Sequence, residues 1–185
     1  MKHRLQITCL VAALAAYPAF AISADPVTKA PPAKVEPSGV HKMDTDFVAK
    51  AGASGLAEVE AGRMALKKTS TDGVRQLANM LIDDHTKANE RLNTLAGLKN
   101  LSVPSEPGEA NRKKLAELEG KSGTAFDEAF LKQQREAHEE AIDLFSKQAK
   151  SGKDADLKKF AAETLPKLQA HLKHVRSLQK GGHDK

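Results

Sequence analysis

Residues 72–98 read DGVRQLANMLIDDHTKANERLNTLAGL, and this stretch decides the fold class. Its apolar side chains recur at intervals of three and four residues, which places them on one face of an α-helix. Thr71 and Asp72 offer a helix N-cap just before the pattern starts. The stretch therefore predicts a long amphipathic helix that buries a histidine near its middle. The buried face comprises Val74, Leu77, Ala78, Leu81, His85, Ala88, Leu92 and Leu95.

Three more stretches show the same helical periodicity, and no stretch shows the alternation of a strand. Helices of similar length with short connections pack side by side as a bundle. We therefore predict an all-α fold, an antiparallel four-helix bundle over residues 46–180, with a short extra helix between the second and third long helices. The further long helices are expected at 46–68, 124–150 and 154–179, and the short one at 109–118.

The ends of these helices are marked by capping residues. Asp46, Thr124 and Asp154 are the expected N-caps of the first, third and fourth long helices. Gly152 is placed as a C-terminal stop between the last two. Pro166 lies inside the fourth helix, where it removes one backbone hydrogen bond and should bend the helix.

The N-terminal residues have the features of a secretory signal peptide. Basic residues at Lys2 and Arg4 precede an apolar run, and small residues suited to cleavage follow it. We predict a signal peptide over residues 1–24, a Pro-rich disordered tether over 25–45 and a frayed tail over 181–185. Cleavage would remove Cys9, the only cysteine, and would place the mature protein in the periplasm or outside the cell.

Composition argues against several function classes. The net charge is +5, but basic and acidic residues are intermixed, there is no Trp, and the single Tyr lies in the predicted signal peptide. Nucleic-acid binding through stacking aromatics therefore has no support. The mature part contains no transmembrane segment by sequence, and glycine-rich phosphate loops and zinc-type cysteine pairs are absent. Loose envelope association and self-association both stay open.

One metal-competent side chain lies near the middle of each long predicted helix: Glu58, His85, His138 and His171. Mid-helix positions share a level in an antiparallel bundle, so these four side chains could converge. Burying them without partners would be costly, so they must be satisfied by a metal ion, by water or by one another. Asp84 could accept a hydrogen bond from a metal-binding side chain, or it could hydrogen-bond to His85 without any metal. His138 is expected at the edge of its face and half exposed.

Several motifs resemble the bacterial domain-of-unknown-function 4142 family. They span most of the chain after Asp46 and include the run from Phe47 to Gly62, Asp83-Asp84-His85 and Leu165-Pro166-Lys167-Leu168-Gln169-Ala170-His171. The resemblance implies a ferritin-like four-helix fold, export and the frequent label of outer membrane protein, with no established activity. It also implies signature residues at Glu58, His85, His138 and His171.

The sequence departs from ferritins at the metal ligands. Ferritin di-iron centres use Glu-x-x-His pairs, but Ile82, Arg135 and Leu168 stand three residues before the three histidines. One carboxylate with three imidazoles suits a single transition-metal ion such as Zn, Cu, Ni or Fe. No catalytic residue is indicated. Two functions therefore stay open, namely a non-catalytic binding protein of the envelope or stress response, which we favour, and a metal-binding or metal-dependent redox protein.

Overall fold

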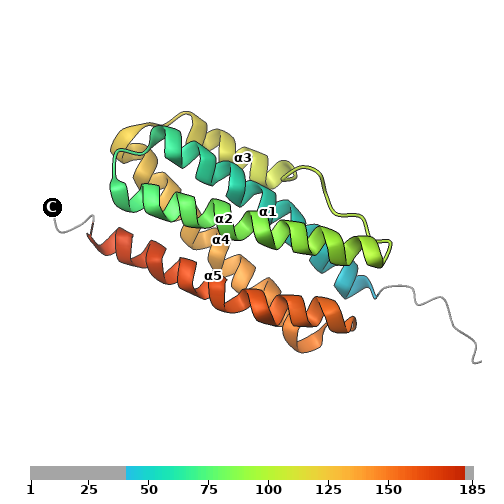
Figure 1. Cartoon of the computed structure of the whole chain (residues 1–185). Coiled ribbons are helices and arrows are strands. Elements are labelled where there is room, and N and C mark those ends of the chain that lie inside the picture. Colours follow the sequence, from blue (N-terminus) through green and yellow to red (C-terminus); the bar gives the residue numbers. More distant parts are fainter. Residues whose placement is uncertain (1–40, 182–185) are drawn as a thin grey trace, which may run out of the picture. The chain divides into compact units, whose positions relative to one another are not determined.

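The structure, a computed structural model, describes residues 41–181 and folds them into five α-helices, with no strand among these residues (Figure 1). The predicted signal peptide, most of the predicted tether and residues 182–185 of the predicted tail lie outside the described residues. None of the described helices is both long and apolar enough to cross a membrane. The helices are α1 (Lys42–Lys68), α2 (Asp72–Leu98), α3 (Glu109–Glu119), α4 (Gly123–Ser151) and α5 (Ala155–Gly181).

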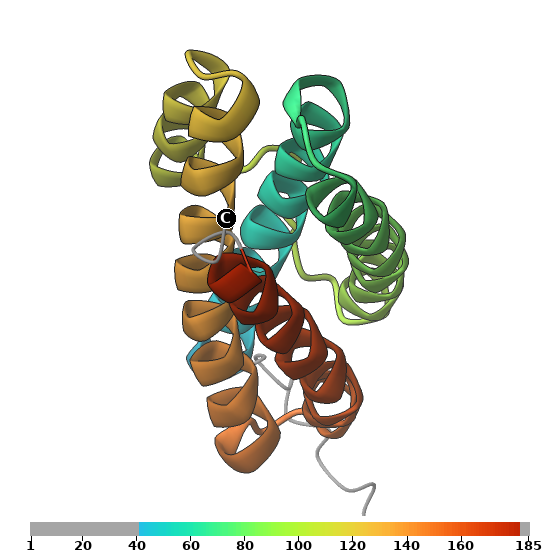
Figure 2. The same cartoon turned by 90° about the vertical axis from the view of Figure 1, so that its left-hand side faces the viewer.

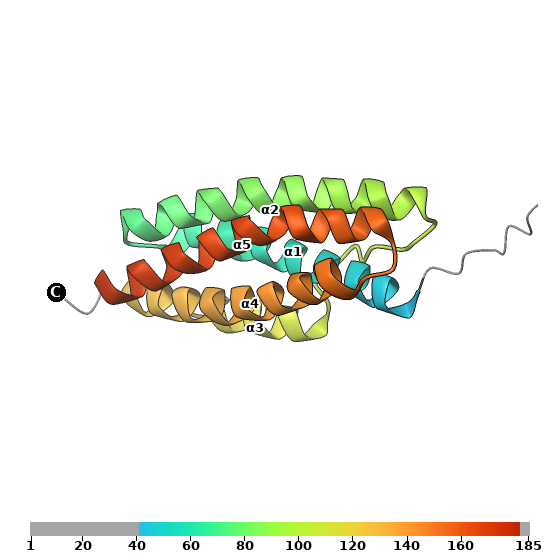
Figure 3. The same cartoon turned by 90° about the horizontal axis from the view of Figure 1, so that it is seen from below.

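The four long helices form two antiparallel hairpins that pack against each other. One hairpin is α1 with α2, the other is α4 with α5, and the hairpins meet through α1 on α4 and α2 on α5 (Figures 1 and 3). The short α3 packs against α1 and against the first turns of α4 (Figure 2). The predicted all-α bundle with a short extra helix is therefore confirmed.

The apolar core is divided into two clusters. The first joins the end of α1 and the start of α2 to α3 and α4, where Phe126 stacks on Phe130 with ring centroids 5.8 Å apart. The second lies toward the other end, where Phe47 meets Phe145 and Phe160 edge-on at 5.0 and 6.2 Å. Glu58 and the three central histidines are buried and lie, each along its own helix, between the residues of the two clusters, so a polar layer separates the clusters.

The start of α1 differs from the prediction. The helix begins at Lys42, so residues 42–45, assigned to the tether, are helical. His41 caps it by accepting a hydrogen bond from the Met43 amide at 3.2 Å, whereas Asp46 lies inside the helix and pairs with Lys42. At α4 the N-cap is Ser122 and not Thr124.

The reason for the early start of α1 is a buried carboxylate. Asp44 is 1% exposed and accepts hydrogen bonds from Gln148 Nε2 at 2.6 Å and from the Lys153 and Asp154 amides at 3.1 Å each. These amides belong to the turn between α4 and α5. Asp154 in turn accepts from the Leu157 amide at 3.0 Å, which confirms it as a capping residue of α5. Asp44 thus ties α1 to the opposite hairpin.

Candidate metal centre

Three imidazoles meet in the polar layer. His85 comes from α2, His138 from α4 and His171 from α5, and their side chains are 8%, 1% and 2% exposed. One ring nitrogen of each lies within 4.8 Å of those of the other two. His138 is therefore fully buried and not half exposed as expected, because α5 closes over the edge of α4 on which it lies.

The hydrogen bonds behind two of the rings assign their tautomers. His138 Nδ1 lies 2.8 Å from the backbone carbonyl oxygen of Gln134, and His171 Nε2 lies 2.9 Å from Asp84 Oδ2. Carbonyl and carboxylate oxygens only accept, so each of these ring nitrogens carries the hydrogen. The opposite nitrogens, Nε2 of His138 and Nδ1 of His171, are then unprotonated in the neutral rings.

These two unprotonated nitrogens face each other at 3.3 Å. Two lone pairs at that distance repel unless a cation lies between them. Two nitrogens bound to one tetrahedral zinc-like ion, each at about 2.0–2.1 Å, are about 3.3–3.4 Å apart. The pair therefore has the spacing of two ligands on a common metal ion. Each ring is also held from behind by an oxygen acceptor, the usual arrangement for a metal-bound histidine.

Burial favours the neutral form of His85 and His171. Burial, together with the neighbouring His138 and His171, lowers the pKa of His85 well below the ordinary value of a histidine. Burial also lowers the pKa of His171, although its hydrogen bond to Asp84 opposes this. Neutral imidazoles offer lone pairs, and lone pairs are what a metal ion requires.

Asp84 supports the cluster from the α2 side. Although burial raises its pKa, hydrogen bonds from Lys167 and His171 outweigh that effect and lower the pKa of this carboxyl overall. Asp84 is therefore ionised and orients the His171 ring. Lys167, which pairs with Asp84 across the α2–α5 interface, had no signal in the sequence because the two residues are far apart along the chain.

Glu58 lies beside the three imidazoles but outside the group of ligand atoms within 4.8 Å. It is buried, and burial raises the pKa of its carboxyl, against the opposing effects of His138 and the Gln134 amide. Its Oε2 has no hydrogen-bond partner among the described residues, and neither has His85 Nε2. The structure thus brings together three of the four predicted ligands and places the fourth next to them.

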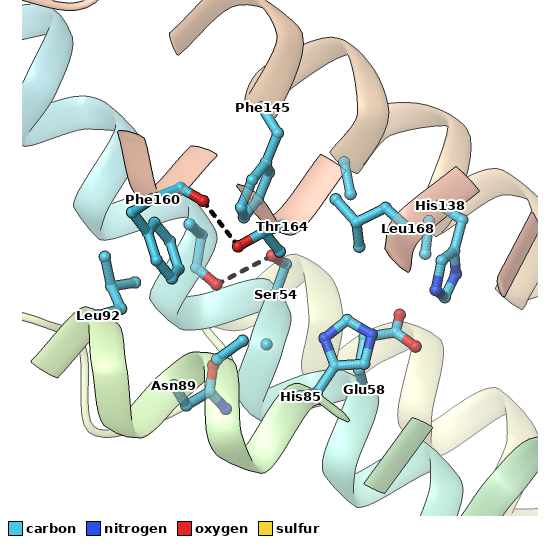
Figure 4. Close-up of a pocket in the computed structure, with 15 residues that line it drawn as sticks. Ser54, Glu58, His85, Asn89, Leu92, His138, Phe145, Phe160, Thr164 and Leu168 are labelled. Carbon is cyan, nitrogen blue, oxygen red and sulfur yellow. Dashed lines mark hydrogen bonds between the residues drawn. The ribbon is translucent and has the colours of Figure 1, made fainter. Parts of the chain in front are cut away.

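A small cavity of about 30 Å³ adjoins this cluster. Glu58, His85 and His138 lie at one end, and Phe145 and Phe160 lie toward the other (Figure 4). The remaining histidines of the described helices stay apart from the cluster: His41 caps α1, and His174 is half-buried on α5 outside it.

Residues 29–178 match the family model described as "Domain of unknown function (DUF4142)". The chain belongs to the DUF4142 family. The match begins earlier along the chain than the motifs by which the sequence resembled this family. The chain matches no curated protein sequence at a significant level.

Several solved structures share the fold of this DUF4142 domain at low sequence identity. A DUF305 protein from Streptomyces coelicolor, described as secreted, is 15% identical with a TM-score of 0.63, covering 74% of this chain and 91% of that chain. A DUF305 fragment from Deinococcus radiodurans is 12% identical with a TM-score of 0.67, covering 75% and 96%. CopM in its Cu(I)-bound form is 17% identical with a TM-score of 0.64, covering 75% and 96%. At these identities the likeness establishes the fold.

Proposed function

We propose that this DUF4142 domain binds one transition-metal ion through His85, His138 and His171. The observation that carries the proposal is the 3.3 Å approach of two unprotonated ring nitrogens, one from His138 and one from His171. A metal ion between them would turn this repulsion into coordination, and the buried Nε2 of His85 would gain a partner as well. Of the two functions that the sequence leaves open, this favours metal binding.

The donor set narrows the choice of metal. Imidazole nitrogens suit Cu²⁺, Zn²⁺ and Ni²⁺, and the order of affinities of first-row divalent ions places Cu²⁺ highest. No cysteine belongs to the cluster among the described residues. CopM, which shares the fold, has been solved with Cu(I) and with Cu(II) bound. We take copper as the first ion to test and zinc as the second.

A metal-free polar network is the competing explanation. It would need a proton between His138 and His171, so that one ring carries a positive charge in the core. The lowered pKa of His171 opposes a charge on that ring, since burial outweighs its hydrogen bond to Asp84. The polar network therefore predicts one protonated ring near neutral pH, whereas the metal site predicts that all three are neutral.

Metal analysis of untagged protein purified from its native compartment tests the proposal. We expect close to one copper or zinc ion per chain, and loss of that ion in His171→Ala. His174→Ala is the matched control, since it removes an imidazole from the same helix one turn away and outside the cluster. Equal metal content in wild type and His171→Ala would overturn the proposal.

We further propose that the protein works after export, in the periplasm or outside the cell, as a binding protein of the envelope or stress response. The predicted signal peptide supports this, as does the description of one protein of the same fold as secreted. Intact-mass measurement of exported material should give an N-terminus between residues 22 and 25. A mass that includes Cys9 would contradict the assignment.

A further inference from the structure

The cavity beside His85 and His138 has polar residues at its inner end. Glu58 Oε2 and His85 Nε2 are both buried, both belong to residues that line the cavity, and neither has a hydrogen-bond partner among the described residues. A cavity holds a water when about 10–15 Å³ is open to the centre of a water-sized sphere and polar partners are present. The cavity, at about 30 Å³, has this room, and Ser54, Asn89 and Thr164 supply polar groups in its lining, while Glu58 Oε2 and His85 Nε2 are buried just behind its wall. It therefore has room for a small polar molecule next to the histidines.

Polar side chains also line the cavity one turn away from the cluster. Ser54 lies one turn before Glu58 on α1, Asn89 one turn after His85 on α2, and Thr164 faces them from α5 (Figure 4). All three are only partly buried. These partly exposed groups therefore give a small hydrophilic molecule polar partners in the outer part of the cavity.

A glycine on α1 lets the Asn89 side chain pack directly against the helix backbone beside the cavity. A Cβ at Gly55 would lie 2.0 Å from Oδ1 of Asn89, so any larger residue would displace the Asn89 side chain. Small side chains at Ala51, Ala88 and Ala141 form the rest of the wall. The space thus depends on small residues contributed by three helices.

We infer that the cavity admits an exogenous small ligand, water or a small monoanion, to a fourth coordination position on the metal ion held by His85, His138 and His171. The inference rests on the proposed function. Three imidazoles fill three of the four positions of a tetrahedral ion, and a site with one open position exchanges ligands, whereas a closed site does not. Glu58 lies outside the nitrogen cluster and lines the cavity, so it faces the incoming ligand and does not complete the protein's own ligand set.

Azide binding to the Cu²⁺-loaded protein tests the inference. Azide is a small monoanion that gives a charge-transfer absorption band and an altered electron paramagnetic resonance spectrum when it coordinates Cu²⁺. We expect both changes, saturable with azide, in the wild-type protein. Ser54→Leu fills the outer part of the cavity and should weaken azide binding by about tenfold or more, with the bound copper unchanged.

Ala53→Leu is the matched control, because it adds the same side chain to α1 at the preceding position, which does not line the cavity. It should bind azide like the wild type, and thermal unfolding monitored by circular dichroism should show both variants folded. Failure of the wild type to bind either Cu²⁺ or Zn²⁺ would overturn the proposed function and this inference together. Stoichiometric copper with spectra that azide leaves unchanged would overturn this inference alone, as would equal azide affinity in the two leucine variants.

Discussion

Acid should destabilise the metal-free bundle through His85. The buried ring stays neutral in the folded state because burial and the two neighbouring imidazoles lower its pKa well below 6.5. The unfolded chain takes up a proton near that value, so the unfolded state binds more protons as the pH falls below about 6.5. The contribution of the neutral His85 ring to the free energy of unfolding is therefore complete above about pH 6.5. It is lost as the pH falls from there toward the lowered pKa of His85 in the folded protein.

The size of the effect follows from linkage. Each pH unit over which one histidine is protonated only in the unfolded state costs about 1.4 kcal/mol. Between pH 6.5 and pH 5 the ceiling for His85 is thus about 2 kcal/mol. His171, whose pKa burial also lowers, adds to the loss in both wild type and variant.

Urea denaturation with a chelator present, at pH 7.5 and pH 5, measures this directly. The wild type should lose more stability than His85→Gln, by up to about 2 kcal/mol. His174→Gln should follow the wild type, because His174 lies outside the cluster. If the wild type instead gained stability relative to His85→Gln at pH 5, a charged imidazole paired with a carboxylate would be the correct description, and the desolvated cluster would be refuted.

Four further outcomes are expected. Asp44→Ala should lower the free energy of unfolding by about 2–4 kcal/mol in urea melts, because it leaves two turn amides and the Gln148 amide without their acceptor; an unchanged midpoint would contradict this. Gly62→Ala should destabilise by about 1–3 kcal/mol, since its Cβ would lie 2.8 Å from Ile82 Cγ1 and 3.2 Å from the Ala78 carbonyl oxygen. Gly97→Ala, with no atom within 4 Å of its Cβ, should be neutral or gain up to about 1 kcal/mol in the same melts. Asp84→Asn should weaken metal binding about 10–100-fold by competition titration, because an amide holds His171 less firmly than a carboxylate does; unchanged affinity would remove Asp84 from the site.

Periodicity was enough to predict the fold, because each helix carries its own signal. The apolar face of residues 72–98 and the capping residue Asp154 are local features, and the structure has α2 and the start of α5 where they indicated. The start of α1 could not be predicted in this way. Asp44 is buried only because the α4–α5 turn, more than a hundred residues later, supplies its hydrogen-bond donors.

In the candidate site, too, some features follow from local sequence and others depend on contacts between distant residues. His85 and His171 lie on clear apolar faces, so their burial follows from spacing. The burial of His138 depends on where α5 crosses α4, and the tautomers depend on a backbone carbonyl at Gln134 and on Asp84 across the α2–α5 interface. These contacts depend on how the helices pack, so helical periodicity could not predict them. Whether these residues hold a metal ion stays a prediction, to be decided by the metal analysis.

The polar layer between the two phenylalanine clusters also bears on how the bundle opens. Local opening requires least free energy where few apolar contacts must be broken. Each end of the bundle is held by its own aromatic cluster, whereas the central turns of the four long helices are joined by imidazoles and carboxyls. In hydrogen exchange the amides of these central turns should therefore be the least protected of the helix interiors in the metal-free protein. A metal ion bound at the centre would join α2, α4 and α5 there. It should therefore raise the protection of amides from hydrogen exchange at the middle of these three helices and leave the protection at their ends almost unchanged.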